Sequence, residues 1–219
     1  MENVWSAVDD YFFELLNKPD PVLESSLRRN AEGGLPAYEV SQNQGKLLQI
    51  FVRMAKAQSV LEIGTLGGYS TIWMARALPE NGHLISLEFD RKHAEVAREN
   101  VRLAGLDSKV EVRIGAALET LPKIATEKRV FDLTFIDADK ANNANYFEWA
   151  IKLSHSGSII IVDNVIRNGA VIDANSIDPS VIGVRKLNEL IQNDPRVDAT
   201  VVQTVGTKGY DGFIIAHVH

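Results

Sequence analysis

Cysteine is absent from the 219 residues of the sequence. Disulfide bonds, thiolate nucleophiles, iron–sulfur clusters and cysteine-bound zinc are therefore excluded. A lack of disulfides suits a reducing compartment, and we expect the protein to be cytoplasmic. Long apolar runs are also missing, so no segment reaches the length that spans a bilayer. The acidic N-terminus lacks the layout of a signal peptide, and we expect no membrane partner.

Positive charge is in short supply, because 23 Lys and Arg face 29 Asp and Glu and leave a formal net charge of −6. Net charge thus gives no reason to expect a nucleic acid as partner, although local basic patches stay open. The Tyr-x-x-x-Lys pattern of short-chain dehydrogenases does not occur. The phosphate-binding Gly-x-x-x-x-Gly-Lys-Ser/Thr loop is missing too, which argues against a nucleotidase of that kind.

The first 57 residues predict helices. Apolar residues recur at helical spacing over 4–16, and the proline-containing segment 18–21 ends that helix. A second helix is expected over 22–29. Ser41 and Gln44 have the spacing of a capping box and predict the start of a third helix. The expected buried face of that helix consists of Leu47, Leu48, Phe51 and Met54. These helices could form an appendage, a lid or a dimer surface.

From residue 59 onward, short apolar runs alternate with stretches long enough for one helix. The runs cover 60–63, 84–87, 110–112, 133–136 and 159–162, followed by a closely spaced pair at 199–204 and 212–218. Such alternation predicts βαβ units, and the final pair predicts an antiparallel hairpin. We expect a doubly wound α/β fold whose mainly parallel, seven-stranded sheet has one reversed strand. The whole chain, 1–219, would be one domain, with 1–57 as an N-terminal helical appendage.

The first buried run leads into a glycine-rich turn at residues 64–68. Glycines after a strand let a ligand approach the backbone, and ligands of these sheets bind at the carboxyl ends of strands. The turn is not Gly-x-Gly-x-x-Gly, so the dinucleotide fingerprint is not matched. Glu62 would repel a pyrophosphate but suits S-adenosylmethionine, which is net cationic. A plain glycine-rich turn without a ligand remains the alternative.

Two further strand ends fit the same ligand. Glu88 lies 24 positions after Gly64, and an acid near that offset commonly accepts hydrogen bonds from ribose hydroxyls. The alternative role for Glu88 is a helix N-cap, which Asp90 can fill by itself. Small residues at 115–117 would leave room for an adenine ring.

Acids gather after the fourth and fifth runs. Asp137, Asp139 and Lys140 follow the fourth run, and Asp163 and Asn164 follow the fifth. Concentrated carboxylates are costly unless a cation neutralises them, and oxygen ligands favour Mg²⁺, Mn²⁺ or Ca²⁺. Each acid could instead cap a helix or form a turn.

With these motifs in place, the chain resembles the cation-dependent O-methyltransferase family, which includes caffeoyl-CoA and bacterial catechol or flavonoid O-methyltransferases. The resemblance runs from about residue 35 to 218. Its motifs are Leu-Glu-Ile-Gly-Thr with Gly-Tyr-Ser at 61–70, Phe-Ile-Asp-Ala-Asp-Lys at 135–140 and Val-Asp-Asn-Val at 162–165. The resemblance implies a Rossmann-like, class I S-adenosylmethionine-dependent methyltransferase fold and a homodimer.

The resemblance also implies roles for individual residues. Glu88 would hold the ribose, Ala117 would lie against the adenine, and Tyr146 would flank the substrate. Lys140 matches the proposed catalytic base, beside Asp137. The implied cofactor contacts are Val40, Glu62, Gly64, Thr65, Gly68, Tyr69, Ser70, Glu88, Ala117, Asp137 and Tyr146. The implied metal ligands are Asp137, Asp163 and Asn164.

Three departures from the family pattern concern the acceptor. Asn143 stands where plant members have Tyr, Arg167 where many have Trp, and the tail segment 206–212 is longer than the plant one. These differences argue against a caffeoyl-CoA acceptor and resemble bacterial enzymes that act on small phenolics. The sequence therefore predicts metal-dependent methyl transfer from S-adenosylmethionine to a catechol-like or flavonoid hydroxyl.

Rival interpretations remain open at this stage. The same cofactor and metal site could methylate a hydroxylated uridine in tRNA, using a patch built from Arg28, Arg29, Arg53 or Lys56. A non-catalytic cofactor-binding protein would not need the complete set of Asp137, Lys140, Asp163 and Asn164. A dinucleotide-dependent oxidoreductase is not supported by the first glycine motif.

Overall fold

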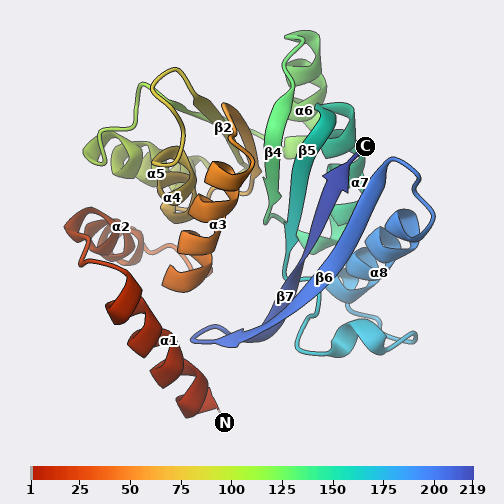
Figure 1. The fold of residues 1–219 in the computed structure, drawn as a ribbon, viewed down its shortest axis with the longest axis horizontal. Helices are drawn as coiled ribbons and strands as arrows, with labels where there is room; N and C mark the ends of the chain where they lie inside the picture. The colour runs from red at the N-terminus through yellow and green to blue at the C-terminus, as the bar shows by residue number, and fades with distance from the viewer. Residues whose placement is uncertain (1) are drawn as a thin grey trace.

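A seven-stranded sheet with helices on both faces forms the protein (Figure 1). The computed structural model describes residues 2–219. The α-helices are α1 (Glu2–Leu16), α2 (Pro21–Glu32), α3 (Gln42–Met54), α4 (Tyr69–Ala75), α5 (Arg91–Leu103), α6 (Ala117–Thr126), α7 (Asn143–Lys152) and α8 (Pro179–Gln192). Two short 3-10 helices are η1 (Lys140–Asn142) and η2 (Ala170–Ile172). The strands are β1 (Ser59–Ile63), β2 (His83–Glu88), β3 (Val110–Ile114), β4 (Phe131–Ile136), β5 (Ser154–Asp163), β6 (Val197–Gly206) and β7 (Gly209–Val218).

The strand order is β3-β2-β1-β4-β5-β7-β6. Strands β1 to β5 pair in parallel, whereas β7 runs antiparallel to both β5 and β6. The predicted doubly wound sheet with one reversed strand is therefore confirmed. The chain moves outward from β1 to β3 and then returns to β4 on the other side of β1. That reversal makes the β1–β4 junction the topological switch point, where ligands of such sheets bind.

The register of the sheet aligns the ends of its central strands. Ile63 of β1 is level with Leu87 of β2 and with Ile136 of β4, and Ile136 is level with Val162 of β5. The residue that follows each of these positions lies at one edge of the sheet. Those residues are Gly64, Glu88, Asp137 and Asp163.

Each face of the sheet has its own apolar core. On one face, Leu121 of α6, Phe147 of α7 and Val184 of α8 are buried against the strands. On the other face, α3 and α4 contribute Val52 and Ile72 to a second core. Both faces of the central strands are therefore dry, which explains why β1 shows an unbroken buried run.

Helix α3 differs from its prediction in part of the set of residues that it buries. Its buried residues are Gly45, Leu48, Gln49 and Val52, whereas Met54 is 71% exposed. The cause is Gly45, where an added Cβ would lie 2.3 Å from the Trp73 ring of α4. Leu48 is buried as predicted, and Leu47 and Phe51 pack half-buried against the core. The close approach adds Gly45 to the buried stripe, and of the predicted face only Met54 lies outside the core.

The capping box that opens α3 is only half formed. Ser41 accepts a hydrogen bond from the Gln44 N–H at 3.2 Å, as predicted. The Gln44 side chain does not complete the box by returning to the backbone of Ser41. It instead donates to the Asp163 carboxylate on β5 at 2.6 Å.

Helix α1 lies at the edge of the molecule and is tied to it by polar contacts. The Asp9 carboxylate accepts hydrogen bonds from the Asn43 side chain at 3.0 Å and from the Thr207 N–H at 2.9 Å. Its apolar side chains are largely exposed, namely Val4, Val8, Tyr11, Phe12, Leu15 and Leu16. Within residues 2–219, neither α1 nor another helix is long and apolar enough to cross a membrane.

Candidate functional site

A cleft of about 1110 Å³ opens at the carboxyl ends of the central strands. It collects most of the residues that the sequence singled out, although they come from distant parts of the chain. Its wall includes Val40, Gly64, Thr65, Tyr69, Ser70, Glu88, Ala117, Asp137, Lys140, Tyr146, Asp163 and Asn164. Of the predicted site residues, Glu62 and Gly68 do not line it. One cavity can therefore hold both predicted halves of the site.

Gly64 sits at the switch point and allows β1 and β4 to meet there. Its φ of 102° is a conformation that side chains disfavour, and an added Cβ would lie 2.4 Å from the Asp137 carbonyl oxygen. Gly68 is also left-handed and begins α4 as its N-cap residue. The glycine turn is therefore required by the close packing around Asp137 as well as by any ligand.

Glu62 lies fully buried beneath the cleft floor. Its carboxylate accepts hydrogen bonds from the hydroxyls of Ser70 at 2.5 Å, Thr71 at 2.5 Å and Ser86 at 2.6 Å. Burial raises the pKa of Glu62 to about 7, even though these hydrogen bonds act in the opposite direction. Ser70 lines the cleft and connects Glu62 to it. Direct contact between Glu62 and a cofactor stays a prediction.

Glu88 is held in the cleft wall by backbone groups. One carboxylate oxygen accepts from Thr65 N at 3.1 Å and Leu66 N at 2.7 Å, and the other accepts from Asp90 N at 2.9 Å. The following helix, α5, is capped by Asp90, whose side chain accepts from Lys92 N and His93 N. The N-cap alternative for Glu88 is thus removed, and its carboxylate is fixed beside the glycine turn.

Asp137 and Asp163 lie at the ends of neighbouring strands, and the ammonium of Lys140 pairs with Asp137. Lys140 Nζ donates to Asp137 Oδ1 at 2.6 Å. Asp163 is 4% exposed and accepts from Asn164 N at 2.8 Å. Burial, together with the charge of Asp137, raises the pKa of the Asp163 carboxyl well above its usual value. Two acids that share one cation in this way leave a carboxylate uncompensated.

Gln44 is a site residue that the sequence did not reveal as one. Its amide bond to Asp163 Oδ2 joins the N-terminal helices to the acidic pair across 119 positions of sequence. The capping-box pattern placed Gln44 at a helix start but carries no information on such a distant partner. The contact fixes the orientation of the Asp163 side chain in the cleft.

Asp139 and Tyr146 form a separate pair on the cleft wall. The Tyr146 hydroxyl donates to Asp139 Oδ1 at 2.5 Å, and Asn142 Nδ2 donates to Oδ2 at 2.6 Å. Burial and then the Asp139 hydrogen bond raise the pKa of Tyr146. Asp139 is therefore engaged away from Asp137 and Asp163. Asn143 is fully buried and lies behind the wall, which Asn142 lines instead.

Two cations come from the segments where the family pattern is broken. Arg167 and Lys208 both line the cleft. Lys208 Nζ donates to the Ala37 carbonyl oxygen at 3.1 Å and lies 3.4 Å from a Glu39 carboxylate oxygen. The β6–β7 turn is thereby attached to the segment that precedes α3. Together these segments form the outer border of the cleft.

The donor atoms around the acidic pair decide whether these residues suit a metal ion. No group of three or more His, Cys, Asp and Glu side chains gathers as a metal site in the part of the chain that is described, residues 2–219. The predicted set has a different composition, since it combines two carboxylates with the amide of Asn164. All of its donors are oxygen atoms, and the pair carries more negative charge than Lys140 offsets. This chemistry fits a hard divalent cation.

Comparison with known proteins gives consistent matches over nearly the whole chain. The family model described as O-methyltransferase matches residues 17–216. A catechol O-methyltransferase from Niastella koreensis is 49% identical over 216 residues, which is 98% of each chain. The crystal structure of the O-methyltransferase from Bacillus cereus in complex with SAH is 54% identical, with a TM-score of 0.99 and all of both chains covered.

A third relative was solved with SAM, whereas the Bacillus cereus structure contains SAH. The O-methyltransferase TomG from Streptomyces achromogenes, involved in tomaymycin synthesis and solved in complex with SAM, is 45% identical with a TM-score of 0.96. The match covers 99% of this chain and 98% of that one. Fold, cleft and sequence agreement lead to the same assignment: this chain belongs to the O-methyltransferase family and is a methyl-transferring enzyme.

Proposed function

We propose that the enzyme transfers the methyl group of S-adenosylmethionine to one hydroxyl of a catechol-like acceptor with the help of a divalent cation. The observation that carries this proposal is the convergence of Asp137, Lys140, Asp163 and Asn164 on one cleft. The same cleft contains the glycine turn and Glu88, so donor and acceptor can meet in it. Flavonoids and other small phenolics that carry two neighbouring hydroxyls would serve in the same way.

The donor fits the wall made by β1, β2 and the start of α6. Glu88 presents carboxylate oxygens to a ribose, and Ala117 leaves room for an adenine. The buried Glu62, through Ser70, adds negative charge that favours a sulfonium and ammonium ligand. The complexes of the Bacillus cereus and Streptomyces achromogenes relatives with SAH and SAM support this choice of donor.

The cation would be held by the oxygen atoms of Asp137, Asp163 and Asn164. Mg²⁺ suits this donor set, with Mn²⁺ and Ca²⁺ as alternatives. Bound there, such an ion supplies Lewis-acid polarisation of the acceptor hydroxyl. The protein's own contribution is to fix the ligands, since Gln44 orients Asp163 and Gly64 lets the end of β4 approach β1 closely.

The bond changes of the transfer are simple and need no covalent enzyme intermediate. The acceptor oxygen forms a bond to the methyl carbon while the carbon–sulfur bond breaks, and the sulfonium becomes a neutral thioether. The hydroxyl proton leaves to water, or to Lys140 Nζ in its neutral amine form, because the ammonium that pairs with Asp137 has no lone pair to accept it. Orientation of donor and acceptor in the cleft then accounts for much of the rate enhancement.

Lys140 can serve as proton acceptor or as a fixed positive charge beside the phenolate. A Lys140→Arg variant separates these roles, because arginine keeps the charge but does not give up a proton near neutral pH. Retained turnover would assign the electrostatic role, and lost turnover with normal donor affinity would assign the base.

The test of the proposal is methyl transfer to a panel of simple catechols, with Mg²⁺ and then with excess EDTA. We expect turnover that needs the metal and that yields one methyl ether per donor consumed. Turnover that survives EDTA would overturn the cation site and require another role for Asp137 and Asp163. Donor binding without turnover of any catechol would overturn the proposal that the acceptor is catechol-like.

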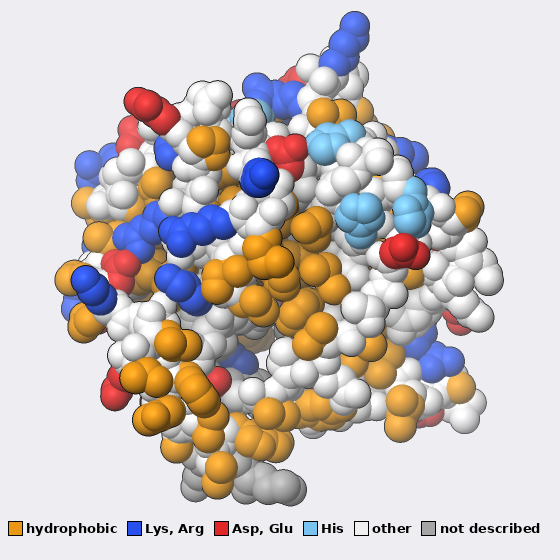
Figure 2. Space-filling view, viewed as in Figure 1, with side chains coloured by type: hydrophobic (Ala, Val, Ile, Leu, Met, Phe, Trp, Pro, Cys, Tyr) orange, Lys and Arg blue, Asp and Glu red, His pale blue; other side chains and the backbone are white. Residues whose placement is uncertain are grey.

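We also propose a homodimer formed through the exposed apolar face of α1. Figure 2 shows hydrophobic side chains gathered over this helix at the lower left and again in the centre of the view. The patch on α1 consists of Val4, Val8, Tyr11, Phe12, Leu15 and Leu16. A second copy offers the same face, as a two-fold interface requires. Light scattering should give twice the chain mass, and Leu15→Glu should shift it to the mass of one chain.

The tRNA alternative receives no support from the relatives named above. The Arg29 side chain, one member of its predicted basic patch, is engaged with Asn100 and Ser25. We therefore favour a small acceptor. We further propose that residues 1–219 act as one methyltransferase domain, in which 1–57 form the helical appendage, and that it works in the cytoplasm.

A further inference from the structure

Arg167 borders the acceptor side of the cleft, yet methyl transfer as proposed above gives it no task. It follows the ligand Asn164 by three positions, on the loop that leaves the end of β5. Glu88 and Ala117, which suit the donor, come from other strand ends. The Arg167 side chain therefore faces the part of the cleft that the acceptor would fill.

The loop that presents Arg167 is held in a strained conformation. Asn164, Arg167 and Asn168 all have positive φ angles, 57°, 54° and 54°. Asparagine tolerates this region, but arginine does so at a cost, and such strain persists where the surroundings enforce it. The loop is therefore built to a definite shape rather than left to vary.

Asp211 of β7 enforces that shape. Its Oδ1 accepts hydrogen bonds from Ile166 N at 2.9 Å, Arg167 N at 3.0 Å and Gly212 N at 3.0 Å. An added Cβ at Gly212 would lie 2.8 Å from the Ile166 side chain, so the loop also packs tightly on β7. The backbone of Arg167 is thus fixed at the cleft border.

The guanidinium of Arg167, in contrast, has little to hold it. Its nearest carboxylate oxygen is Asp211 Oδ2 at 4.0 Å, and 32% of its side chain is exposed. The other cations in the cleft wall are engaged, since Lys140 donates to Asp137 and Lys208 bonds to Ala37 and pairs with Glu39. Arg167 is the cleft cation that can take an external anion without giving up a close partner.

We infer that Arg167 binds an anionic substituent of the acceptor, so that the preferred substrates are catechols that carry a carboxylate. This inference rests on the proposed function and deepens it. A guanidinium pairs with a carboxylate through two parallel hydrogen bonds, and a partly enclosed site strengthens that contact. A neutral catechol would lack the contact, and a catechol with an amine side chain would be repelled. No bond to the substituent forms or breaks.

The experiment compares 3,4-dihydroxybenzoate with 3,4-dihydroxybenzamide, which differ in charge but hardly in shape. In the wild-type enzyme with saturating S-adenosylmethionine and Mg²⁺, we expect kcat/KM for the carboxylate to exceed that for the amide at least tenfold. Arg167→Met should remove most of that preference, mainly through KM, because it should lower kcat/KM for the carboxylate much more than for the amide. Arg167→Lys should keep part of the preference.

Arg129→Met is the matched control, because it removes the same charge from a surface position near the end of α6. This control variant should leave kcat/KM unchanged for both acceptors. Equal kcat/KM for carboxylate and amide in the wild type would overturn the inference, as would equal losses for both acceptors in Arg167→Met. The wild-type comparison decides the matter even if that variant folds poorly. Turnover of the amide shows that the proposed function stands, whereas turnover of neither acceptor would overturn the proposed function itself.

Discussion

Two aspartates at opposite ends of neighbouring strands show how the same residue type serves different purposes. Asp132 lies at the start of β4, where it accepts hydrogen bonds from Gln58 N at 2.7 Å, Ser59 N at 2.8 Å and the His155 ring at 2.8 Å. Burial acts to raise its pKa, but these partners outweigh burial and hold the pKa of Asp132 below its usual value. Asp163, at the end of β5, has its pKa shifted the other way.

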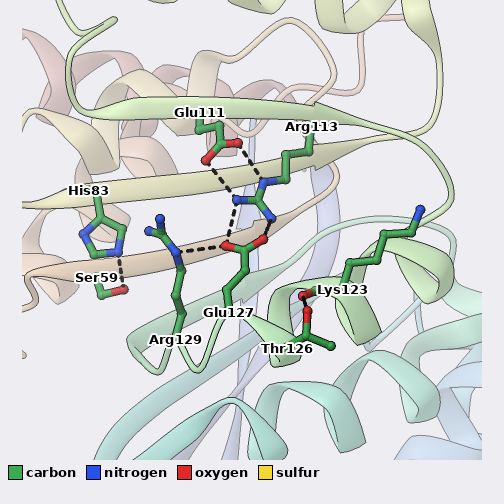
Figure 3. Close-up of polar contacts among 8 residues, drawn as sticks. All are labelled: Ser59, His83, Glu111, Arg113, Lys123, Thr126, Glu127 and Arg129. Carbon is green, nitrogen blue, oxygen red and sulfur yellow. Dashed lines mark hydrogen bonds and ion pairs between the residues drawn. The ribbon is translucent and has the colours of Figure 1, made fainter.

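A cluster of charged side chains around the edge strand β3 follows the Asp132 pattern. Figure 3 shows Arg113 of β3 bonded to Glu111 and to Glu127, with Arg129 also paired to Glu127. Hydrogen bonding to Arg113 lowers the pKa of Glu127. Each acid in this group has a guanidinium partner. The comparison teaches that the acids paired with guanidinium groups here serve structure, whereas the buried Asp163, beside the second carboxylate of Asp137, marks the binding site.

The largest effect should come from Asp163→Ala. Methyl transfer should fall on the order of a hundredfold to a thousandfold, because a ligand of the proposed cation is lost. On stability, two effects oppose each other: the variant removes a buried acid whose pKa is raised, but it also leaves the Gln44 amide and the Asn164 N–H without their acceptor. We therefore expect the free energy of unfolding of the metal-free protein to change less than in Asp132→Ala. Steady-state kinetics and thermal unfolding measure the two effects. Full activity in this variant would show that Asp163 has no role in methyl transfer.

Asp132→Ala should show the opposite profile. Three donors would lose their acceptor, and we expect the free energy of unfolding to drop by about 1–3 kcal/mol. Methyl transfer at a temperature well below the midpoint should stay within twofold of the wild type. Denaturant titration beside an activity assay provides the check. A fall in turnover as large as that of Asp163→Ala would show that Asp132 is not a purely structural residue.

The buried Glu62 should make stability depend on pH. The pKa of Glu62 in the folded protein is about 7, against an ordinary value of 4.5, so the folded state binds the proton more tightly. This favourable contribution is complete below the unfolded pKa and is lost as pH rises through the folded one. Between pH 6 and pH 8, we expect the titration of Glu62 to lower the free energy of unfolding of the donor-free protein by about 1 kcal/mol.

Glu62→Gln should flatten that dependence, because glutamine does not titrate. Asp163 contributes in the same direction, so some slope should remain. Chemical unfolding at several pH values measures the difference between the two proteins. An identical slope in the variant and the wild type would show that Glu62 is already ionised throughout this range.

Sequence patterns predicted the sheet and most of the cleft because both depend on local signals. Apolar runs of strand length, a glycine turn and acids at strand ends are readable without the fold, and parallel order brings those ends together. Side chains that act across the fold left no such signal. Gln44 looked like half of a capping box, and nothing in the local sequence of Asp211 indicated its three bonds to the distant loop.

On α3, the exposure of Met54 and the burial of Gly45 escaped prediction for a related reason. Apolar spacing ranks Met54 above Gly45, but close packing against Trp73 selects the residue without a side chain. A pattern of hydrophobic residues reports which faces are apolar, and it does not report how near two helices approach. Tertiary packing decided the orientation of this helix.

The central claim is that Asp137 and Asp163, two neighbouring carboxylates with the ammonium of Lys140 beside Asp137, form a cation site at the strand ends. Its most direct test is calorimetric titration of Mn²⁺ into the wild-type protein, Asp163→Ala and Asp132→Ala, without donor or acceptor. The account predicts one Mn²⁺ per chain in the wild type and in Asp132→Ala, and at least tenfold weaker binding in Asp163→Ala. Equal Mn²⁺ binding by all three proteins, or none by the wild type, would contradict it.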